Sequence, residues 1–239
     1  MTPMRSTKRD EARMQTVIFC GHPHLEASGS HQFLKAATPK SIPFEQIELP
    51  LTTETIEHHQ SLIMTCDRFF IQFPLYWYQA PGSISGWLEA VLTDDFMESM
   101  GTHWQDKEMG IILSTGRPVS AFQSGGEENF TISDLLKPFE ALATNLGMTY
   151  LPPFVLAQHH YATPEEQRCH LIQYQMALTL PKGAHFSERT RWLMASLKEH
   201  ERTLPDVLKE QLEPFLMSWE DALDQWEALR MELPKNPWQ

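Results

Sequence analysis

The sequence predicts an α/β fold, in which a doubly wound, five-stranded parallel sheet is covered by helices on both faces and followed by a helical extension. Five short apolar segments rich in β-branched and aromatic residues predict the strands, at residues 16–20, 44–49, 68–73, 109–113 and 148–156. Segments with helical apolar spacing separate them, and this alternation is typical of a parallel sheet. The chain has 239 residues and is 41% hydrophobic, which is enough for one such domain and an appendage.

The first part of the pattern begins with a buried strand, Thr16–Cys20, that runs into a loop of small residues. A helix is then predicted by three apolar residues that share one face, namely Phe33, Leu34 and Ala37. Phe44–Leu49 predicts the second strand, and after a turn Thr52 or Thr53 can cap the next helix.

The third predicted strand, Arg68–Phe73, stops at Pro74, which cannot donate a ladder hydrogen bond. Helical spacing follows up to Thr93, through Ile84, Trp87, Leu88 and Val91. Met109–Leu113 predicts the fourth strand.

The fifth strand follows a loop rich in Gly, Pro and Ser and a helix that Thr131 or Ser133 can cap. Its Pro152-Pro153 pair predicts an edge position. Beyond about residue 163 the pattern is wholly helical. We therefore expect a flexible arm at 1–15, a main domain at 16–180 and a helical extension at 181–239.

Composition argues against several classes of protein. The formal net charge of −12, from 19 basic and 31 acidic residues without a basic cluster, disfavours binding to nucleic acid. Cys20, Cys66 and Cys169 lie far apart, as expected in a reducing compartment. No apolar run is long enough to span a bilayer, and the charged N-terminus lacks the apolar centre of a signal peptide. We therefore expect a cytoplasmic protein.

Three loops leave the carboxyl ends of strands, where an open parallel sheet binds ligands. The first, Gly21–His31, can hold a phosphate through serine hydroxyls and the N-terminus of the following helix, or it can be a capped helix start and no more. The second, Phe73–Gly82, carries Tyr76, Trp77 and Tyr78, which either stack on a planar ligand or cover the sheet edge. The third begins at Ser114, and its small residues allow close backbone approach.

Histidine is frequent, with 11 residues, but the histidine clusters lack the spacing of metal ligands. Solvated loop histidines are the preferred interpretation of His22-Pro-His24, His58-His59 and His159-His160. We expect no metal site. His160 and Tyr161, after the fifth strand, are candidates for lining a pocket for the electron acceptor.

Two longer pieces carry a family resemblance that covers residues 16–180. Phe73–Leu92 is similar to the pattern F-P-x-x-W-Y-x-x-P followed by K-G-W, and a second matching piece runs from Gly125-Gly126 to Phe154. Both resemble the NAD(P)H quinone oxidoreductase family, which has a flavodoxin-like fold and includes the ancillary flavoproteins of glutathione-regulated potassium efflux systems. The resemblance implies a non-covalently bound flavin, FMN or FAD, and a homodimer with its sites at the interface.

The matching motifs also imply which residues bind the flavin. Its phosphate and ribityl chain would be held by His22, Ser28, Ser30 and His31. The ring would be flanked by Pro74, Leu75, Tyr76, Trp77 and Tyr78. Its pyrimidine end would meet Ser114, Thr115, Gly116 and Arg117.

The chain departs from the family pattern at several positions. His31 stands where the family usually has Asn, Ser85 replaces a lysine, and Ser-Thr-Gly-Arg-Pro replaces Thr-Thr-Gly-Gly at 114–118. The family's W-x-Y-G stretch is absent, and Asp94–Trp104 occupies its place. These departures concern the pyrimidine contacts and the acceptor pocket.

The resemblance implies an enzyme that passes hydride from NADH or NADPH to the flavin and then to a quinone or similar small electrophile, by a two-electron ping-pong reaction. No side-chain nucleophile is expected, and the backbone N–H groups of Thr115 and Gly116 are the candidate donors near flavin N1 and O2. The alternative is a flavin-binding regulatory subunit of a potassium efflux transporter at the membrane. A simple electron carrier fits the aromatic loop less well.

The extension also has two interpretations. Its helices either pack on their own domain or reach the partner subunit, anchored by Trp219, Trp226 and Trp238.

Overall fold

The computed structural model describes residues 14–203 and 205–232. Its contacts divide the chain into two compact units, of which the first ends at Thr179 and the second begins at Leu180. Most of the expected N-terminal arm and Trp238 of the extension lie outside the described residues.

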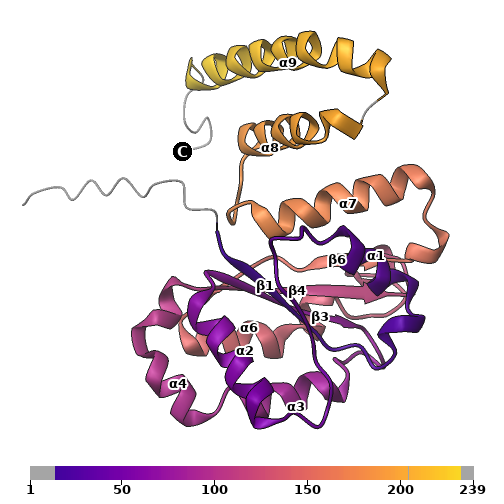
Figure 1. The fold of residues 1–239 in the computed structure, drawn as a ribbon. Coiled ribbons are helices and arrows are strands. Elements are labelled where there is room, and N and C mark those ends of the chain that lie inside the picture. Colours follow the sequence, from indigo (N-terminus) through magenta and orange to yellow (C-terminus); the bar gives the residue numbers. More distant parts are fainter. Residues whose placement is uncertain (1–13, 204, 233–239) are drawn as a thin grey trace, which may run out of the picture. The chain divides into compact units, whose positions relative to one another are not determined.

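The first unit is built on a parallel sheet with helices on both of its sides (Figure 1). Its strand order, β2-β1-β3-β4-β5, is the flavodoxin-like order. Its strands are β1 (Thr16–Cys20), β2 (Phe44–Gln46), β3 (Arg68–Pro74), β4 (Glu108–Thr115), β5 (Thr149–Tyr150) and β6 (Phe154–Ala157). The predicted fifth strand is divided, since β5 and β6 both pair with β4 and the Pro152-Pro153 pair between them lacks N–H donors. Its predicted place at the edge of the sheet is confirmed.

The described part of this unit contains seven α-helices, of which all but the last lie between strands. They are α1 (Gly29–Ala37), α2 (Thr53–Thr65), α3 (Gly82–Val91), α4 (Asp94–Met100), α5 (Ile132–Leu135), α6 (Lys137–Leu146) and α7 (Pro164–Thr179). Of the alternative caps, Thr52 begins α2 and Thr131 begins α5. The helix predicted as one segment up to Gly147 is broken between α5 and α6, because Pro138 has no N–H to continue the ladder.

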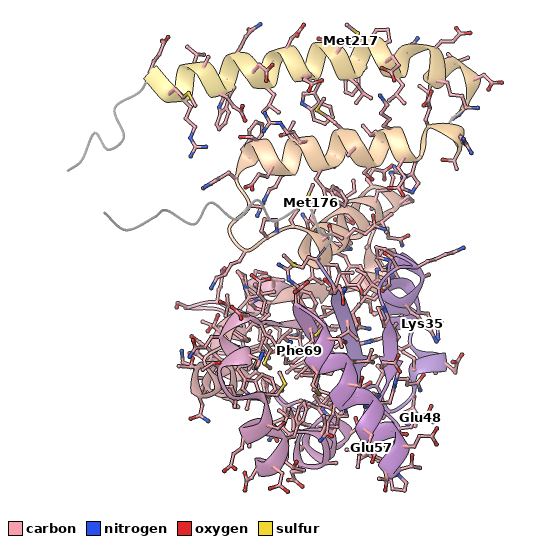
Figure 2. All side chains as sticks on the ribbon, turned by 60° about the vertical axis from the view of Figure 1, so that its left-hand side comes forward. Lys35, Glu48, Glu57, Phe69, Met176 and Met217 are labelled. Atoms are coloured by element: carbon pink, nitrogen blue, oxygen red, sulfur yellow. The ribbon has the colours of Figure 1, made fainter. Side chains whose placement is uncertain are left out.

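The sheet separates two buried apolar layers, each lying between the sheet and the helices that cover it. Alternate residues of β3 point to opposite faces, so Phe69 and Ile71 pack in the layer of α2, α3, α4 and α6, whereas Phe70 packs in the layer of α1 and α7. Figure 2 shows Phe69 in the interior of this unit and Glu57 on the outer side of α2. Burying a side chain of this size contributes roughly 1.5–3 kcal/mol, so these layers stabilise the sheet whose edge carries the loops.

The second unit is an antiparallel helix pair, α8 (Phe186–Glu199) and α9 (Asp206–Glu232). Arg191 forms an ion pair with Glu227 at 2.9 Å, and Lys198 with Glu213 at 3.2 Å. Both pairs join an early residue of one helix to a later residue of the other. In the described part of the chain, no helix has the length and apolar character needed to cross a bilayer.

Candidate functional site

The predicted ligand loops meet at one edge of the sheet. In the parallel register, Cys20 of β1 lies opposite Gln72 of β3, and Pro74 lies opposite Ser114 of β4. The loops after β1, β3 and β4 therefore start side by side, and the short helix η4 (His159–Tyr161) follows β6 at the same end. This is where an open parallel sheet binds ligands.

The loop after β1 presents unpaired backbone donors. Ser28 caps α1, with its Oγ accepting a hydrogen bond from the His31 N–H at 3.4 Å. The N–H groups of Gly29 and Ser30 have no acceptor within the described residues. His22 shapes the loop, because its Nδ1 accepts the His24 N–H at 2.9 Å. A helix N-terminus with unpaired N–H groups and a serine hydroxyl suits a phosphate.

His160 lies beside this phosphate-binding candidate. A Cβ added to Gly29 would come within 2.8 Å of His160 Cε1, so the imidazole covers the first turn of α1. The ring of His159 packs on Phe33 of α1, with 4.4 Å between ring centroids, and this contact places η4. Tyr161 is 82% exposed.

The loop after β3 forms a tight hairpin turn at Tyr76–Gln79. Tyr76 and Gln79 exchange two backbone hydrogen bonds of 3.1 and 3.0 Å, and Trp77 and Tyr78 occupy the left-handed region with φ of 50° and 63°. Residues other than glycine rarely adopt this backbone conformation, which costs on the order of 1–3 kcal/mol for each residue. The turn leaves Trp77 91% exposed and Tyr76 and Tyr78 about half exposed, so the aromatic faces are open to a planar ligand.

A carboxylate that the sequence did not single out holds this turn. Tyr78 Oη donates to Glu128 Oε2 at 2.7 Å, and Arg117 Nε donates to Glu128 Oε1 at 2.9 Å. Arg117 also pairs with Glu127. We call Tyr78, Arg117, Glu127 and Glu128 the clasp; it joins three loops. No motif marks the two glutamates, whose contacts with Tyr78 and Arg117 depend on tertiary structure.

Electrostatics within the clasp keep it charged at neutral pH. The hydrogen bonds from Tyr78 and Arg117 lower the pKa of Glu128, and the same carboxylate raises the pKa of Tyr78. Two carboxylates surround the one guanidinium, so Arg117 offers little uncompensated positive charge to a ligand.

The loop after β4 combines fixed and open groups. The Ser114 carbonyl accepts the Leu75 N–H at 2.8 Å, and Thr115 Oγ1 accepts the Arg117 N–H at 3.2 Å. A Cβ at Gly116 would meet nothing within 4 Å. The backbone N–H of Gly116 has no acceptor within the described residues. Gly116 therefore offers a backbone donor with free space above it.

His31 lies behind this edge, in a buried polar network. Its ring is 0% exposed, with Nε2 2.8 Å from Ser114 Oγ and Nδ1 3.0 Å from Gln72 Nε2. Burial, followed by the nearby His22, lowers the pKa of His31 to about 3, so the ring is neutral. The side chain therefore reaches the ligand loops through Ser114, while the backbone of His31 belongs to the first turn of α1.

The segment in place of the family's W-x-Y-G stretch contributes to the core instead. Asp94–Trp104 forms α4 and the start of a 3-10 helix, and Phe96, Met100 and Trp104 are buried among apolar residues. These three side chains are unavailable to an acceptor. Among the described residues there is no group of three side chains that could hold a metal ion.

Similarity to known proteins agrees with this geometry. The family model Flavodoxin_2, described as a flavodoxin-like fold, matches residues 14–177. General stress protein 14 of Bacillus subtilis (strain 168) is 34% identical over 158 residues, which are 64% of this chain and 90% of the relative. A glutathione-regulated potassium-efflux system ancillary protein, KefG of Serratia proteamaculans (strain 568), is 32% identical over 120 residues, 50% of this chain and 66% of that protein.

Two solved structures are similar as well. An NADPH-quinone reductase from P. pentosaceus is 38% identical with a TM-score of 0.66, covering 70% of this chain and 99% of that one. A general stress protein 14 from Treponema denticola, solved in complex with FMN, is 25% identical with a TM-score of 0.62, covering 69% of this chain and 97% of that one.

Proposed function

Because the chain belongs to the family with the flavodoxin-like fold, we propose that it is an FMN-dependent NAD(P)H oxidoreductase that reduces quinones or similar small electrophiles. The observation that carries this proposal is the pairing, at one sheet edge, of an exposed aromatic turn with unpaired backbone donors on α1 and at Gly116. The NADPH-quinone reductase and the FMN complex among the similar structures support it.

The residues present fit a flavin. Ser28 and the N–H groups of Gly29 and Ser30 would bind its phosphate, with His160 beside them. Tyr76, Trp77 and Tyr78 would flank its ring, on the aromatic turn that starts after Pro74 and Leu75. Gly116 would direct its backbone donor at the pyrimidine edge, whereas Thr115, the other expected donor, pairs with Ala157 in the ladder between β4 and β6.

When bound, the flavin would supply the hydride chemistry that links the nicotinamide donor to the acceptor. The protein binds the phosphate, holds the ring against the aromatic turn and offers hydrogen-bond donors where negative charge develops, near N1 and O2. The clasp keeps Tyr78 in its left-handed conformation during these steps. One site serves both half-reactions, so we propose a ping-pong order.

A homodimer is part of the proposal. An apolar cavity of about 500 Å³ adjoins the aromatic turn, between Tyr78, Leu88 of α3 and Leu142 of α6. Val119 and Phe130 are exposed in the segment between β4 and α5, where Val119 begins a short 3-10 helix. A partner that covers these groups would also close the site. Light scattering of the purified protein measures its oligomeric state directly.

The test of the function is a spectrum. Purified protein should be yellow or should become yellow with added FMN, should bleach when NADH or NADPH is added without oxygen, and should recolour with a quinone. Parallel double-reciprocal plots at varied donor and quinone would confirm the ping-pong order. A protein that binds neither FMN nor FAD contradicts the proposal.

The second candidate is a flavin-binding ancillary subunit of a potassium efflux system in the cytoplasm. It is favoured by the similarity to KefG. Co-purification with a transporter, dependent on bound flavin, would support it, and turnover with quinones would not exclude it because one site serves both roles.

A further inference from the structure

The buried histidine connects two parts of the candidate flavin site. The backbone of His31 lies in the first turn of α1, where its N–H faces Ser28 Oγ at 3.4 Å. Its imidazole crosses to the end of β4, where Nε2 is 2.8 Å from Ser114 Oγ. Ser114 in turn holds the start of the aromatic loop, since its carbonyl accepts the Leu75 N–H at 2.8 Å.

The direction of the His31–Ser114 hydrogen bond follows from Gln72. An amide nitrogen only donates, so Gln72 Nε2, 3.0 Å from His31 Nδ1, makes that ring nitrogen an acceptor. In this orientation both polar atoms of the amide have a partner, since Cys20 Sγ lies 3.6 Å from Gln72 Nε2 and the Tyr174 hydroxyl lies 3.5 Å from Gln72 Oε1. A neutral imidazole that accepts at Nδ1 carries its proton at Nε2.

The Nε2–H group therefore donates to Ser114 Oγ. A hydroxyl that accepts this bond still has its own proton to donate. Ser114 is 7% exposed and stands at the border between the buried network and the edge that carries Thr115 and Gly116. Its proton is thus available at this edge rather than consumed inside the network.

We propose that His31 is a positioning residue that keeps the Ser114 hydroxyl a hydrogen-bond donor toward the pyrimidine edge of the flavin. This inference rests on the proposed function, because it needs a flavin at that edge. Negative charge builds up near N1 and O2 of the ring when it takes up hydride. A donor fixed there binds the reduced flavin more tightly than the oxidised flavin and so raises the midpoint potential of the bound cofactor.

The decisive measurement is the midpoint potential of bound FMN, determined by dye equilibration in the full-length protein. Ser114→Ala and His31→Phe should each weaken binding of reduced relative to oxidised FMN about tenfold, which lowers the potential of a two-electron couple by about 30 mV. The double variant should fall no further, because His31 acts through Ser114. Additive shifts, or an unchanged potential in either single variant, would overturn the inference.

Two measurements remain decisive if the buried substitution prevents folding. Gln72→Met removes the donor to Nδ1 at a residue of similar size, so it should lower the potential in the same direction. Nitrogen-15 NMR of the wild-type imidazole should show His31 protonated at Nε2 and unprotonated at Nδ1. The opposite tautomer would overturn the assignment.

Thr16→Val is the matched control. Thr16 Oγ1 donates to the Leu178 carbonyl at 3.0 Å, so this variant also loses a buried hydrogen bond on the same face of the sheet, but at the other end of β1. It should lower stability and leave the potential unchanged. If wild-type protein binds no flavin, the proposed function fails and this inference with it; if it binds FMN and only the potentials stay constant, this inference alone fails.

Discussion

Gly116 offers a direct test of where the ligand lies. A Cβ at this position meets no atom within 4 Å, and the residue is exposed, so the protein itself has room for a larger side chain. We therefore expect Gly116→Val to change the free energy of unfolding of the flavin-free protein by no more than about 0.5 kcal/mol. The added methyl groups would instead occupy space that the pyrimidine edge of the flavin needs.

The valine keeps the backbone N–H, so the expected cost is that of moving the flavin out of reach of one well-placed donor. Removing such a donor costs about 3 kcal/mol of stabilisation in other enzymes, which corresponds to a factor of about a hundred. Gly116→Val should lower FMN affinity and turnover with NAD(P)H and quinone together, approaching this factor. Flavin fluorescence quenching measures the affinity, stopped-flow absorbance the reduction rate, and urea titration of the flavin-free protein its stability.

Gly116→Ala is the graded control, because both variants keep the N–H donor but alanine adds one carbon atom where valine adds three. Its affinity should stay within about threefold of wild type, since a single Cβ leaves most of the space open. Wild-type affinity and rate in Gly116→Val would refute our placement of the pyrimidine edge. A large loss of stability in the flavin-free variant would refute the premise that the space is free.

Four further expectations concern other parts of the chain. Glu128→Gln should weaken FMN binding severalfold, since it loosens the clasp. Adding Tyr78→Phe to this variant should weaken binding no further, and additive losses would show that the two residues act separately. Burial lowers the pKa of His31 to about 3. Between that value and about 6.5, the pKa of an unperturbed histidine, the unfolded chain binds more protons than the folded chain. As the pH is lowered from about 6.5, the free energy of unfolding should therefore decrease by up to about 1.4 kcal/mol per pH unit. His31→Gln should flatten that slope in urea titrations, and an unchanged slope would assign it to other groups. Burial raises the pKa of Cys20 to about 12 and of Cys66 to about 11, so a disulfide reagent should modify exposed Cys169 alone in the native protein and all three thiols after unfolding. A chain ending at Thr179 should fold and bind FMN, because both apolar layers of the first unit consist of residues before that position; loss of the dimer in this variant would support an extension that reaches the partner.

The sheet could be predicted from the sequence because its signals are local. Apolar runs such as Arg68–Phe73 appear where expected, and Pro74 marks the end of that strand in the structure too. The break between α5 and α6 is also a local signal, since Pro138 lacks a donor, but one apolar periodicity runs through both helices. The order of the strands depends on non-local pairing, which only the family resemblance supplied.

The site was predictable to the level of its loops. Parallel topology brings the ends of β1, β3 and β4 together, so loops chosen from separate segments meet. The side-chain contacts within and between these loops were not predictable. Glu128 lies fifty positions after Tyr78 in the chain, and His31 lies 83 positions from Ser114, so neither contact leaves a periodic or spacing signal.

Two of the departures from the family pattern, at His31 and at Arg117, have polar partners close by in the structure. His31, in place of the usual Asn, reaches Ser114, which itself begins the altered Ser-Thr-Gly-Arg-Pro segment. Arg117, the other change in that segment, is compensated by Glu127 and Glu128 rather than left free. An unpaired buried imidazole would carry a penalty of about 1–3 kcal/mol, and an uncompensated guanidinium would shift the potential of a nearby anionic ring. Because each change has its partner on a neighbouring loop, the edge keeps its backbone donors, and we expect single reversions such as His31→Asn to lower stability unless Ser114 is changed with it.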